Sequence, residues 1–401
     1  EGTRYLAACE DGQEGAVFWD GRRLEGEVRL PAHIRIVAGG AFYGNDRVTA
    51  VFLPESVTWI GPAAFKGCSR LRKAFLPSGM KKLEAEVFSG CRSLEEVAAG
   101  ENKVYGTPGV PAWETVGERA FYQCENLKHI SWEDLREAGR EAFAGCRSLK
   151  CGEWKKAVRI GERALEGTGF LQDETGCPSI AGTIVVSGAG CVGVVQVPEG
   201  VTGIAPYAFA GNRRITGVLL PESLAAVGEG AFFGCSRLRS VRFPAGLQRI
   251  GSRAFERCIS LQEIETSVRQ AGAYAFAGCR SLRKAVLPGV SILGAYMFAY
   301  CGELQECVCG QAKAVQSFCF SGCGKLQGFS AGGLSVIRAY AFEGCESLRQ
   351  VELKDGVYVG VHAFEDCSGI TDIRLTGEEG KVCLAEYAFS GCTALQRAGL
   401  Q

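Results

Sequence analysis

The side chains in this 401-residue chain with the clearest chemical potential are its twenty cysteines. Five of them fall within a short segment: Cys301, Cys307, Cys309, Cys319 and Cys323. Soft thiolates at such short spacings suit zinc or an iron–sulfur cluster, so a metal site is one interpretation. The alternative is that each thiol is a small buried side chain in a repeating position, because free cysteine packs like an apolar residue. The repeat described below favours buried thiols, and we expect neither a metal nor another cofactor.

A glycine-rich segment at residues 188–193, Gly-Ala-Gly-Cys-Val-Gly, has the spacing of a dinucleotide-binding fingerprint. That motif requires a helix directly after the glycines, so that the phosphates meet the helix N-terminus. Here Val195 and Val197 alternate as in a strand, and Pro198 follows. The segment therefore predicts a turn and a strand, and not a nucleotide site.

The three histidines do not form a catalytic pattern. His33, His129 and His362 lie more than 90 residues apart from one another in the sequence. No Ser/His/Asp or Cys/His relay is indicated, and the carboxylates are scattered over positions expected to face solvent. We therefore expect that the protein is not an enzyme.

The overall composition excludes two further classes of function. Lys and Arg total 44 and Asp and Glu total 44, so the chain lacks the basic excess of a nucleic-acid-binding protein. The most apolar stretch, residues 183–197, is too short to span a bilayer and is interrupted by glycines, so we expect no membrane insertion. The chain begins at Glu1 without a secretory leader, which predicts a processed or trimmed product.

A repeat of 22 to 23 residues runs through almost the whole chain. It is marked by an anchor residue, usually preceded by Ala, at Phe42, Phe65, Phe88, Phe121, Phe143, Leu165, Phe209, Phe232, Phe255, Phe276, Phe298, Phe320, Phe342, Phe364 and Phe389. Cysteine stands three residues after the anchor in twelve units, at Cys68, Cys91, Cys124, Cys146, Cys235, Cys258, Cys279, Cys301, Cys323, Cys345, Cys367 and Cys392. Asn45 and Asn212 occupy this cysteine column in two other units.

The repeating unit predicts one short strand and one turn. Apolar residues nine and eleven after the anchor, such as Val51 and Leu53, alternate as in a strand with one inward row, and Pro54 ends it. The segment around the anchor is too short and glycine-rich for a full helix, so we expect a turn or a short 3₁₀ or α piece. The glycine two after the anchor should be left-handed.

Stacking the units should place every column in a ladder of like side chains. Neighbouring thiols of the cysteine column should then point the same way, with their Cβ atoms near ~5 Å, which does not favour disulfides. We therefore expect free, buried thiols in the column. We also expect that denaturation exposes close to all twenty thiols in the chain.

The unit Leu-x-x-Val-x-Leu-Pro-x-x-Val-x-x-Ile-Gly-x-x-Ala-Phe-x-Gly-Cys resembles the BspA-like leucine-rich repeats of bacterial surface antigens over residues 31–400. The resemblance implies a right-handed, curved leucine-rich repeat solenoid with short parallel strands along one face. It also implies a protein displayed on or released from bacterial cells that binds surface molecules. No particular ligand follows from it.

A longer periodicity indicates two modules. A shift of 167 residues superimposes residues 31–77 on 198–244 without a gap, and residues 16–30 on 183–197. The second pair of segments reads as two short runs around a Gly-containing turn, which is a hairpin signal. We expect a first module at 1–167 and a second at 168–401, each opening with a hairpin, in one continuous solenoid.

Two features are candidates for binding. The strand position ten after the anchor should face outward, and it holds apolar residues at Phe52, Phe75, Leu219, Val286 and Val308. Exposed apolar residues in adjacent units could form a binding patch, unless another segment covers them. The second feature is the insertion at residues 100–113, with Tyr105 and Trp113, because insertions in repeat arrays form loops on one face.

These features predict a non-catalytic binding or adhesion module that engages a protein or a glycan at the cell surface or outside the cell. One alternative is a structural spacer that holds another domain away from the surface. A second alternative is an intracellular, cytoplasmic scaffold, which unpaired thiols favour because an oxidising compartment would pair them.

Overall fold

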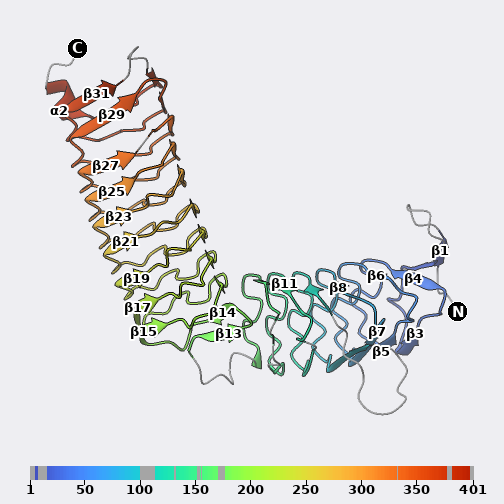
Figure 1. The fold of residues 1–401 in the computed structure, drawn as a ribbon. Coiled ribbons are helices and arrows are strands. Elements are labelled where there is room, and N and C mark those ends of the chain that lie inside the picture. Colours follow the sequence, from blue (N-terminus) through green and yellow to red (C-terminus); the bar gives the residue numbers. More distant parts are fainter. Residues whose placement is uncertain are drawn as a thin grey trace. The chain divides into compact units, whose positions relative to one another are not determined.

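The computed structural model describes residues 5–7, 16–99, 113–130, 132–150, 154, 156–169, 177–331, 333–376 and 382–397. The chain divides into two compact units, Glu1–Val186 (unit 1) and Ser187–Gln401 (unit 2). Each unit is a stack of coils joined by parallel strand pairs, which confirms the predicted leucine-rich repeat solenoid (Figure 1). No helix in these described ranges is long and apolar enough to cross a bilayer. The predicted module boundary at 167/168 and the continuity of the solenoid stay predictions.

Unit 1 contains three sheets. The long-strand sheet is β3 (Gly26–Arg29), β5 (Val48–Phe52), β7 (Lys73–Leu76) and β9 (Glu96–Ala99). The short-strand sheets are β1 (Tyr5–Ala7), β2 (Ala16–Phe18), β4 (Ile34–Val37) and β6 (Trp59–Ile60), and then β8 (Lys82–Leu83), β10 (Thr115–Val116), β11 (Glu137–Ala138) and β12 (Arg159–Ile160). The neighbours β13 (Ser179–Ala181) and β14 (Ile184–Ser187) lie at the division between the units.

Unit 2 repeats the pattern with more coils, and Figure 1 shows its long strands one above the next. The long strands are β15 (Gly193–Gln196), β17 (Ile215–Leu219), β19 (Ser240–Arg242), β21 (Glu263–Glu265), β23 (Lys284–Val286), β25 (Glu306–Cys309), β27 (Gly328–Ala331), β29 (Gln350–Lys354) and β31 (Asp372–Thr376). The short strands are β16 (Gly203–Ile204), β18 (Ala226–Val227), β20 (Arg249–Ile250), β22 (Gln270–Ala271), β24 (Ile292–Leu293), β26 (Ala314–Val315), β28 (Val336–Ile337), β30 (Tyr358–Val359) and β32 (Cys383–Leu384). A short helix, α2 (Thr393–Arg397), follows.

The long strands form where the alternating apolar residues predict them. In β7, Ala74 and Leu76 are buried while Lys73 is exposed and Phe75 is half-buried, so one row faces the core and the other faces outward. The strand ends immediately before Pro77, whose missing N–H cannot continue the ladder. The alternation therefore fixes which side chains are available for binding.

Each coil also contributes a short strand that the sequence analysis did not predict. It usually contains two residues and includes the aliphatic position five before the anchor, as at Ile250 in β20. Two residues are too few to show a periodic pattern. This second strand pairs with the short strands of neighbouring coils, so each coil is bonded to its neighbours at a second place besides its long strand.

The anchor phenylalanines form a continuous stack through the core of each unit. Ring centroids of successive anchors lie 4.7 to 5.6 Å apart with nearly parallel planes, beginning at Phe18 in unit 1 and at Phe209 in unit 2. Offset stacking adds to the burial energy of each ring. The backbone follows the same path, because Phe42 N–H donates to the Ala64 carbonyl of the next coil and Phe65 N–H to Val87.

The cysteine column is a ladder of hydrogen bonds as well as of packed thiols. All twelve cysteines are free and buried, which confirms the prediction for this column. Each Sγ–H donates to the carbonyl of the anchor in the preceding coil, as Cys68 does to Phe42, at 3.0 to 3.4 Å. A thiol is small enough for this inward site and can still donate a weak hydrogen bond.

The expectation that nearly all twenty cysteines are free thiols is wrong for two residues. Cys177 and Cys191 are disulfide-bonded. Neither belongs to the cysteine column, so the argument from parallel Cβ directions does not apply to them. Both lie beside the strands at the division between the units, outside the regular coil.

The glycines of the turn have two separate structural roles. Gly67, two after the anchor, has a φ of 76°, and the equivalent glycines are left-handed as predicted. Gly251, four before its anchor, lies so close to the preceding coil that a Cβ atom there would be 2.6 Å from the Glu229 nitrogen. The first glycine is required by conformation, and the second by contact between backbones.

The two runs predicted to form each opening hairpin do not pair with each other, although the first module does open on an antiparallel pair, β1 with β2. The two runs at residues 16–30 form β2 and β3, which belong to different sheets, and the runs at 183–197 form β14 and β15, which also lie in different sheets. β2 instead pairs antiparallel with β1 and parallel with β4. The Gly-containing turn thus links two faces of one coil, and each strand finds its partner in a neighbouring coil.

Residues 167 apart in the two opening coils nevertheless make equivalent contacts. Asn45 Nδ2 donates to the carbonyls of Gly21 and Leu24, and Asn212 Nδ2 donates to those of Gly188 and Cys191. Asparagine replaces cysteine here because it can satisfy two carbonyls of the opening turn at once. The Gly188 motif is followed by strand β15, as predicted.

Substitution of Gly251 by Ala should destabilise unit 2 by about 1–3 kcal/mol, because the new methyl group would push two backbones apart. Gly302 is the matched control, since a Cβ atom there would meet nothing within 4 Å. Its replacement by Ala should change stability by no more than about 0.5 kcal/mol. The midpoints of chemical unfolding measure both changes, and equal midpoints for the two variants would contradict the close-approach argument.

Thiol titration should separate one cysteine from the rest. Cys383 is exposed, whereas the other fifteen free cysteines of the described residues are buried. Burial raises the pKa of Cys235 and of Cys301 to about 12, so these thiols remain protonated and unreactive at pH 8. Among the cysteines that the structure describes, one fast-reacting thiol is expected in the native protein, and Cys383→Ser should remove its contribution. Denaturation without reductant should release the buried thiols, whereas several fast native thiols would show that the column is open.

Candidate functional site

The outward face of the unit 1 long-strand sheet carries two aligned rows of side chains. In one row, the register of the four strands places Glu27, Ala50, Lys73 and Glu96 side by side in that order. The other row is Arg29, Phe52, Phe75 and Ala98. We call Arg29, Phe52, Phe75, Arg70, Arg72 and Lys73 the strand-face patch.

The aromatic part of the strand-face patch is a stack. The Phe52 and Phe75 rings lie 4.6 Å apart with an interplanar angle of 4°. The Arg29 guanidinium lies 3.8 Å from the centroid of the Phe52 ring, in cation–π geometry. Both rings are half-buried, and Ala98, the next residue in the row, is buried. The structure therefore brings the two predicted phenylalanines together and presents their edges to solvent.

A positively charged depression adjoins this stack. Its volume is about 410 Å³, and Arg70, Arg72 and Lys73 line it together with Glu27. Lys73 pairs with Glu96 at 3.4 Å. Arg70 and Arg72 form no ion pair with any residue that the structure describes, and both are exposed. Since Lys73 is paired with Glu96, the two guanidinium groups of Arg70 and Arg72 are the cations that would attract an acidic group.

The predicted outward residues of unit 2 do not form one patch. Val286 and Val308 lie opposite each other in β23 and β25, and both are half-buried. Leu219 is exposed, but its neighbour in the row is Arg242, and Glu265 precedes Val286. A single apolar patch through all three is therefore not present.

The predicted binding loop is only partly described. Tyr105 lies outside the described residues. Trp113 is fully buried and packs against the anchor Phe121 with ring centroids 5.5 Å apart. The prediction that Trp113 belongs to a binding loop is therefore wrong, because its side chain fills the core and is closed to a ligand.

The five clustered cysteines are packed thiols in the core. Cys307 and Cys309 have their sulfurs 3.5 Å apart, and hydrogen bonding to Cys309 together with burial raises the pKa of Cys307. Burial also raises the pKa of Cys319. Metals bind the thiolate form, which these environments disfavour. The described part of the chain contains no group of three or more His, Cys, Asp or Glu side chains placed to hold a metal ion.

His362 belongs to an aromatic ladder on unit 2 that the sequence analysis missed. The ladder is the column two before the anchor: Tyr274, Tyr296, Phe318, Tyr340, His362 and Tyr387, with successive ring centroids 4.6 to 5.2 Å apart. All six residues have φ between 55° and 59°. The sequence signal for this ladder was the recurrence of aromatic residues about every 22 positions in unit 2. It is absent from unit 1, where the same column holds mainly Arg, Glu and Ala.

The ladder has a structural role along most of its length. Each interior ring has both faces covered by its neighbours, and Arg253 lies 5.3 Å from the centroid of the first ring, Tyr274. Burial and the neighbouring Tyr274 raise the pKa of Tyr296. A sugar or a base stacks on the face of an aromatic ring, so the interior of the ladder offers such a ligand only ring edges.

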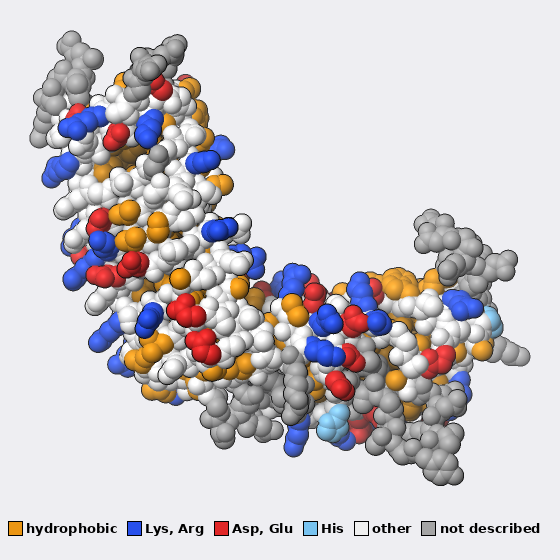
Figure 2. Space-filling view, in the orientation of Figure 1, with side chains coloured by type: hydrophobic (Ala, Val, Ile, Leu, Met, Phe, Trp, Pro, Cys, Tyr) orange, Lys and Arg blue, Asp and Glu red, His pale blue; other side chains and the backbone are white. Residues whose placement is uncertain are grey.

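Charged side chains bind successive coils together at the surface. Lys128 pairs with Glu95 at 3.0 Å, and Lys284 with Glu306 at 3.0 Å. Figure 2 shows acidic and basic side chains interspersed on the visible face of both units.

Replacing Tyr296 by Ala should lower the stability of unit 2 by about 1–3 kcal/mol, because two stacking contacts are lost. Tyr296→Phe keeps both contacts and should be nearly neutral. Tyr300 is a control, since it is also left-handed but is 65% exposed. Chemical unfolding of the three variants measures these differences; a Tyr300→Ala loss as large as that of Tyr296→Ala would contradict a stabilising ladder.

Comparison with known proteins agrees with the repeat. Residues 18–105, 111–180, 202–327 and 313–401 match the model of the BspA type leucine rich repeat region. No curated protein sequence matches the chain significantly.

Several solved structures resemble the chain. A leucine-rich repeat protein from Bacteroides ovatus ATCC 8483 is 21% identical over 98% of this chain and 92% of that chain, with a TM-score of 0.48. The pneumococcal vaccine antigen PcpA is 18% identical over 93% and 97%, with a TM-score of 0.46. A leucine rich cell surface protein from Faecalibacterium prausnitzii A2-165 is 20% identical over 94% and 93%, with a TM-score of 0.35. Because the family model covers most of the sequence, the chain belongs to the BspA type leucine rich repeat family.

Proposed function

We propose that the chain is a non-catalytic protein-binding module, displayed on or released from a bacterial cell, that engages an acidic partner protein through the strand-face patch. The observation that carries this proposal is the Phe52–Phe75 stack beside the exposed guanidinium groups of Arg70 and Arg72, which form no ion pair within the described residues. Membership in the BspA type family supports the surface location.

The composition of the strand-face patch is that of a protein interface. Aromatic and arginine side chains dominate the binding energy of protein complexes. Ring edges that are already half-buried lose little further freedom on binding, and the stack with Arg29 holds them in place. An apolar side chain on the partner would contact the rings while its acidic neighbours enter the depression.

A protein partner fits the patch better than a glycan. The facing surfaces of the Phe52 and Phe75 rings cover each other, and Arg29 lies over the Phe52 ring. Sugar rings would find few open aromatic faces here. A pure spacer, in turn, has no need of two exposed arginines beside exposed aromatic edges, because such surfaces favour association.

The experiment is selection of a random peptide library on phage against the immobilised full chain. Enriched peptides should combine Asp or Glu with an adjacent apolar residue. The Phe52→Ser/Phe75→Ser double variant should bind them at least about tenfold more weakly, since each buried ring contributes about 1.5–3 kcal/mol. Rising salt should also weaken binding, because the cations are exposed.

The matched control is Val286→Ser/Val308→Ser, which changes the equivalent outward row of unit 2. It should retain binding, and the thermal midpoints of both double variants should stay close to that of the parent. Failure to enrich any acidic peptide, or equal loss in both double variants, would contradict the proposed function. A large fall in thermal stability for the phenylalanine variant would show that the two rings serve the core.

A further inference from the structure

Among the described residues, the long-strand sheet of unit 2 is interrupted at two places, between β19 and β21 and between β27 and β29. Several Cα atoms of β19 and β21 still lie within 8 Å of each other, so the second interruption is the wider one. Among the described residues, β27 bonds to β25 on one side and β29 bonds to β31 on the other, but β27 and β29 are not bonded to each other. The rest of the coil stack continues through this point. β28 pairs with both β26 and β30, and the anchor rings of Phe320, Phe342 and Phe364 stay 5.0 Å apart.

Two substitutions in inward columns coincide with the interruption between β27 and β29. Phe329 stands nine after its anchor, where neighbouring coils have the smaller Cys307 and Val351. Its ring lies edge-on to Phe320 and Phe342, with centroids 5.4 and 5.1 Å apart. A ring in this column holds the strands apart. Two residues later, Ala331 leaves space where the next coil has Leu353.

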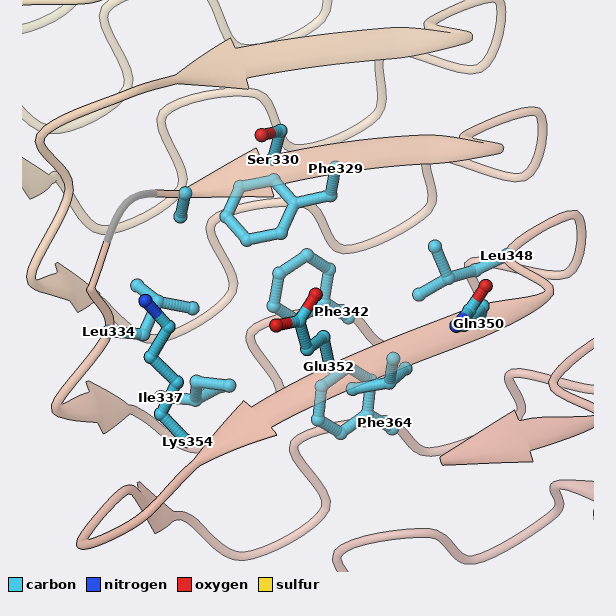
Figure 3. Close-up of a pocket in the computed structure, with 12 residues that line it drawn as sticks. Phe329, Ser330, Leu334, Ile337, Phe342, Leu348, Gln350, Glu352, Lys354 and Phe364 are labelled. Atoms are coloured by element: carbon cyan, nitrogen blue, oxygen red, sulfur yellow. The ribbon is translucent and has the colours of Figure 1, made fainter. Parts of the chain in front are cut away.

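The result is a cavity that opens between the two strands. Its volume is about 170 Å³, close to the ~150 Å³ of an apolar cavity that accepts benzene. Its apolar lining is Phe329, Leu334, Ile337, Phe342, Leu348 and Phe364. Ser330, Gln350, Glu352 and Lys354 also line it. Figure 3 shows Phe329 and Phe342 between the strand that carries Ser330 and the strand that carries Glu352.

The backbone edges that face this cavity lack the bonds found one coil earlier. Gly328 N–H donates to the Gln305 carbonyl at 3.1 Å, but the equivalent bond from Gln350 to Gln327 is not made within the described residues. Hardly any Cα atoms of β27 and β29 lie within 8 Å of each other. Bonded strands are about 4.8 Å apart, so one extended chain fits between two strands separated by about 9.6 Å. Unpaired backbone groups at two facing edges are a template for such a chain.

We propose that the β27–β29 gap binds an extended segment of a partner polypeptide as an added strand, with an aromatic side chain in the cavity and a basic residue next to it. The aromatic ring matches the cavity in size and lining. The basic residue would lie in the outward row on the open side of Glu352, just as Lys284 pairs with Glu306 at 3.0 Å in the same sheet face of this unit. On its other side Glu352 lies opposite Arg374, which pairs with Asp372, and accepts a hydrogen bond from the Thr376 hydroxyl at 3.4 Å. This site is separate from the strand-face patch and does not depend on the proposed function of that patch.

The probe is the blocked peptide acetyl-Ser-Thr-Ser-Phe-Lys-Thr-Ser-amide, titrated calorimetrically into the full chain. Replacing its Phe by Ala should weaken binding at least about tenfold, through the lost burial of the ring. Replacing its Lys by Glu should also weaken binding. N-methylation of the backbone beside the Phe should abolish it, because an added strand requires those N–H groups.

The protein variant Phe329→Val/Ala331→Leu restores the usual residue sizes of the two columns and should close the gap. It is expected to lose peptide binding while its thermal midpoint stays equal or rises, so that loss of binding is separated from loss of folding. Ala331→Leu alone fills the cavity and should lose the preference for Phe over Ala in the peptide. Phe52→Ser/Phe75→Ser should bind the peptide normally, which distinguishes this site from the strand-face patch.

Several results would overturn the proposal. These are absence of binding at millimolar peptide, equal binding of the Phe and Ala peptides, or equal binding of the N-methylated peptide. Binding of free phenol without binding of the peptide would show that the cavity takes small molecules and that no strand is added. Unchanged binding by the folded Phe329→Val/Ala331→Leu variant would place the peptide elsewhere.

Discussion

The structure depends on one constraint: an anchor phenylalanine cannot be buried by its own coil. Each ring is covered by the rings of the coils on either side of it, and its carbonyl accepts the thiol of the following coil, as Phe232 does from Cys258 at 3.2 Å. The glycines four before the anchor allow the backbones to approach closely enough for both contacts, as at Gly251. The phenylalanine, cysteine and glycine columns are therefore parts of one interaction that repeats along each unit, and stability is the sum of neighbouring contacts.

Once these inward columns hold the stack, the outward rows are free to vary. In unit 1 the outward row places Phe52 on Phe75, beside two arginines without ion-pair partners in the described chain. In unit 2 the residues that depart from the repeat, Phe329 and Ala331, lie in the inward columns. The long strands are separated there, while β28 and the anchor stack keep the coil in place. The same redundancy of connections explains how a unit can carry a gap in one sheet. Binding surfaces can thus arise from either row.

Periodic features of the sequence were predictable, and single contacts were not. The anchors, the strand alternation and the buried thiols follow from columns that recur many times. The strands of the opening hairpins were assigned wrongly because two short runs around a glycine turn look alike whether they pair with each other or with neighbouring coils. The bonded cysteines Cys177 and Cys191 lie off the cysteine column, and burial of Trp113 depends on its contact with Phe121. The β27–β29 gap could not be predicted, because it depends on the sizes of Phe329 and Ala331 relative to the residues they face in the next coil. A linear sequence pattern does not show which residues face each other.

Hydrogen exchange of the free, full chain tests the central claim most directly, because it reports the protection of each strand separately. If the anchor stack and the short strands hold unit 2 together, amides of β28 and β30 should be as protected as those of β24 and β26. Fast exchange within the long strands of unit 2 should then be confined to the unbonded edges, those between β27 and β29 and those between β19 and β21. Rapid exchange of β28 together with both long strands would show that the coils part at this point, and it would contradict an account in which the stack of anchors carries the fold.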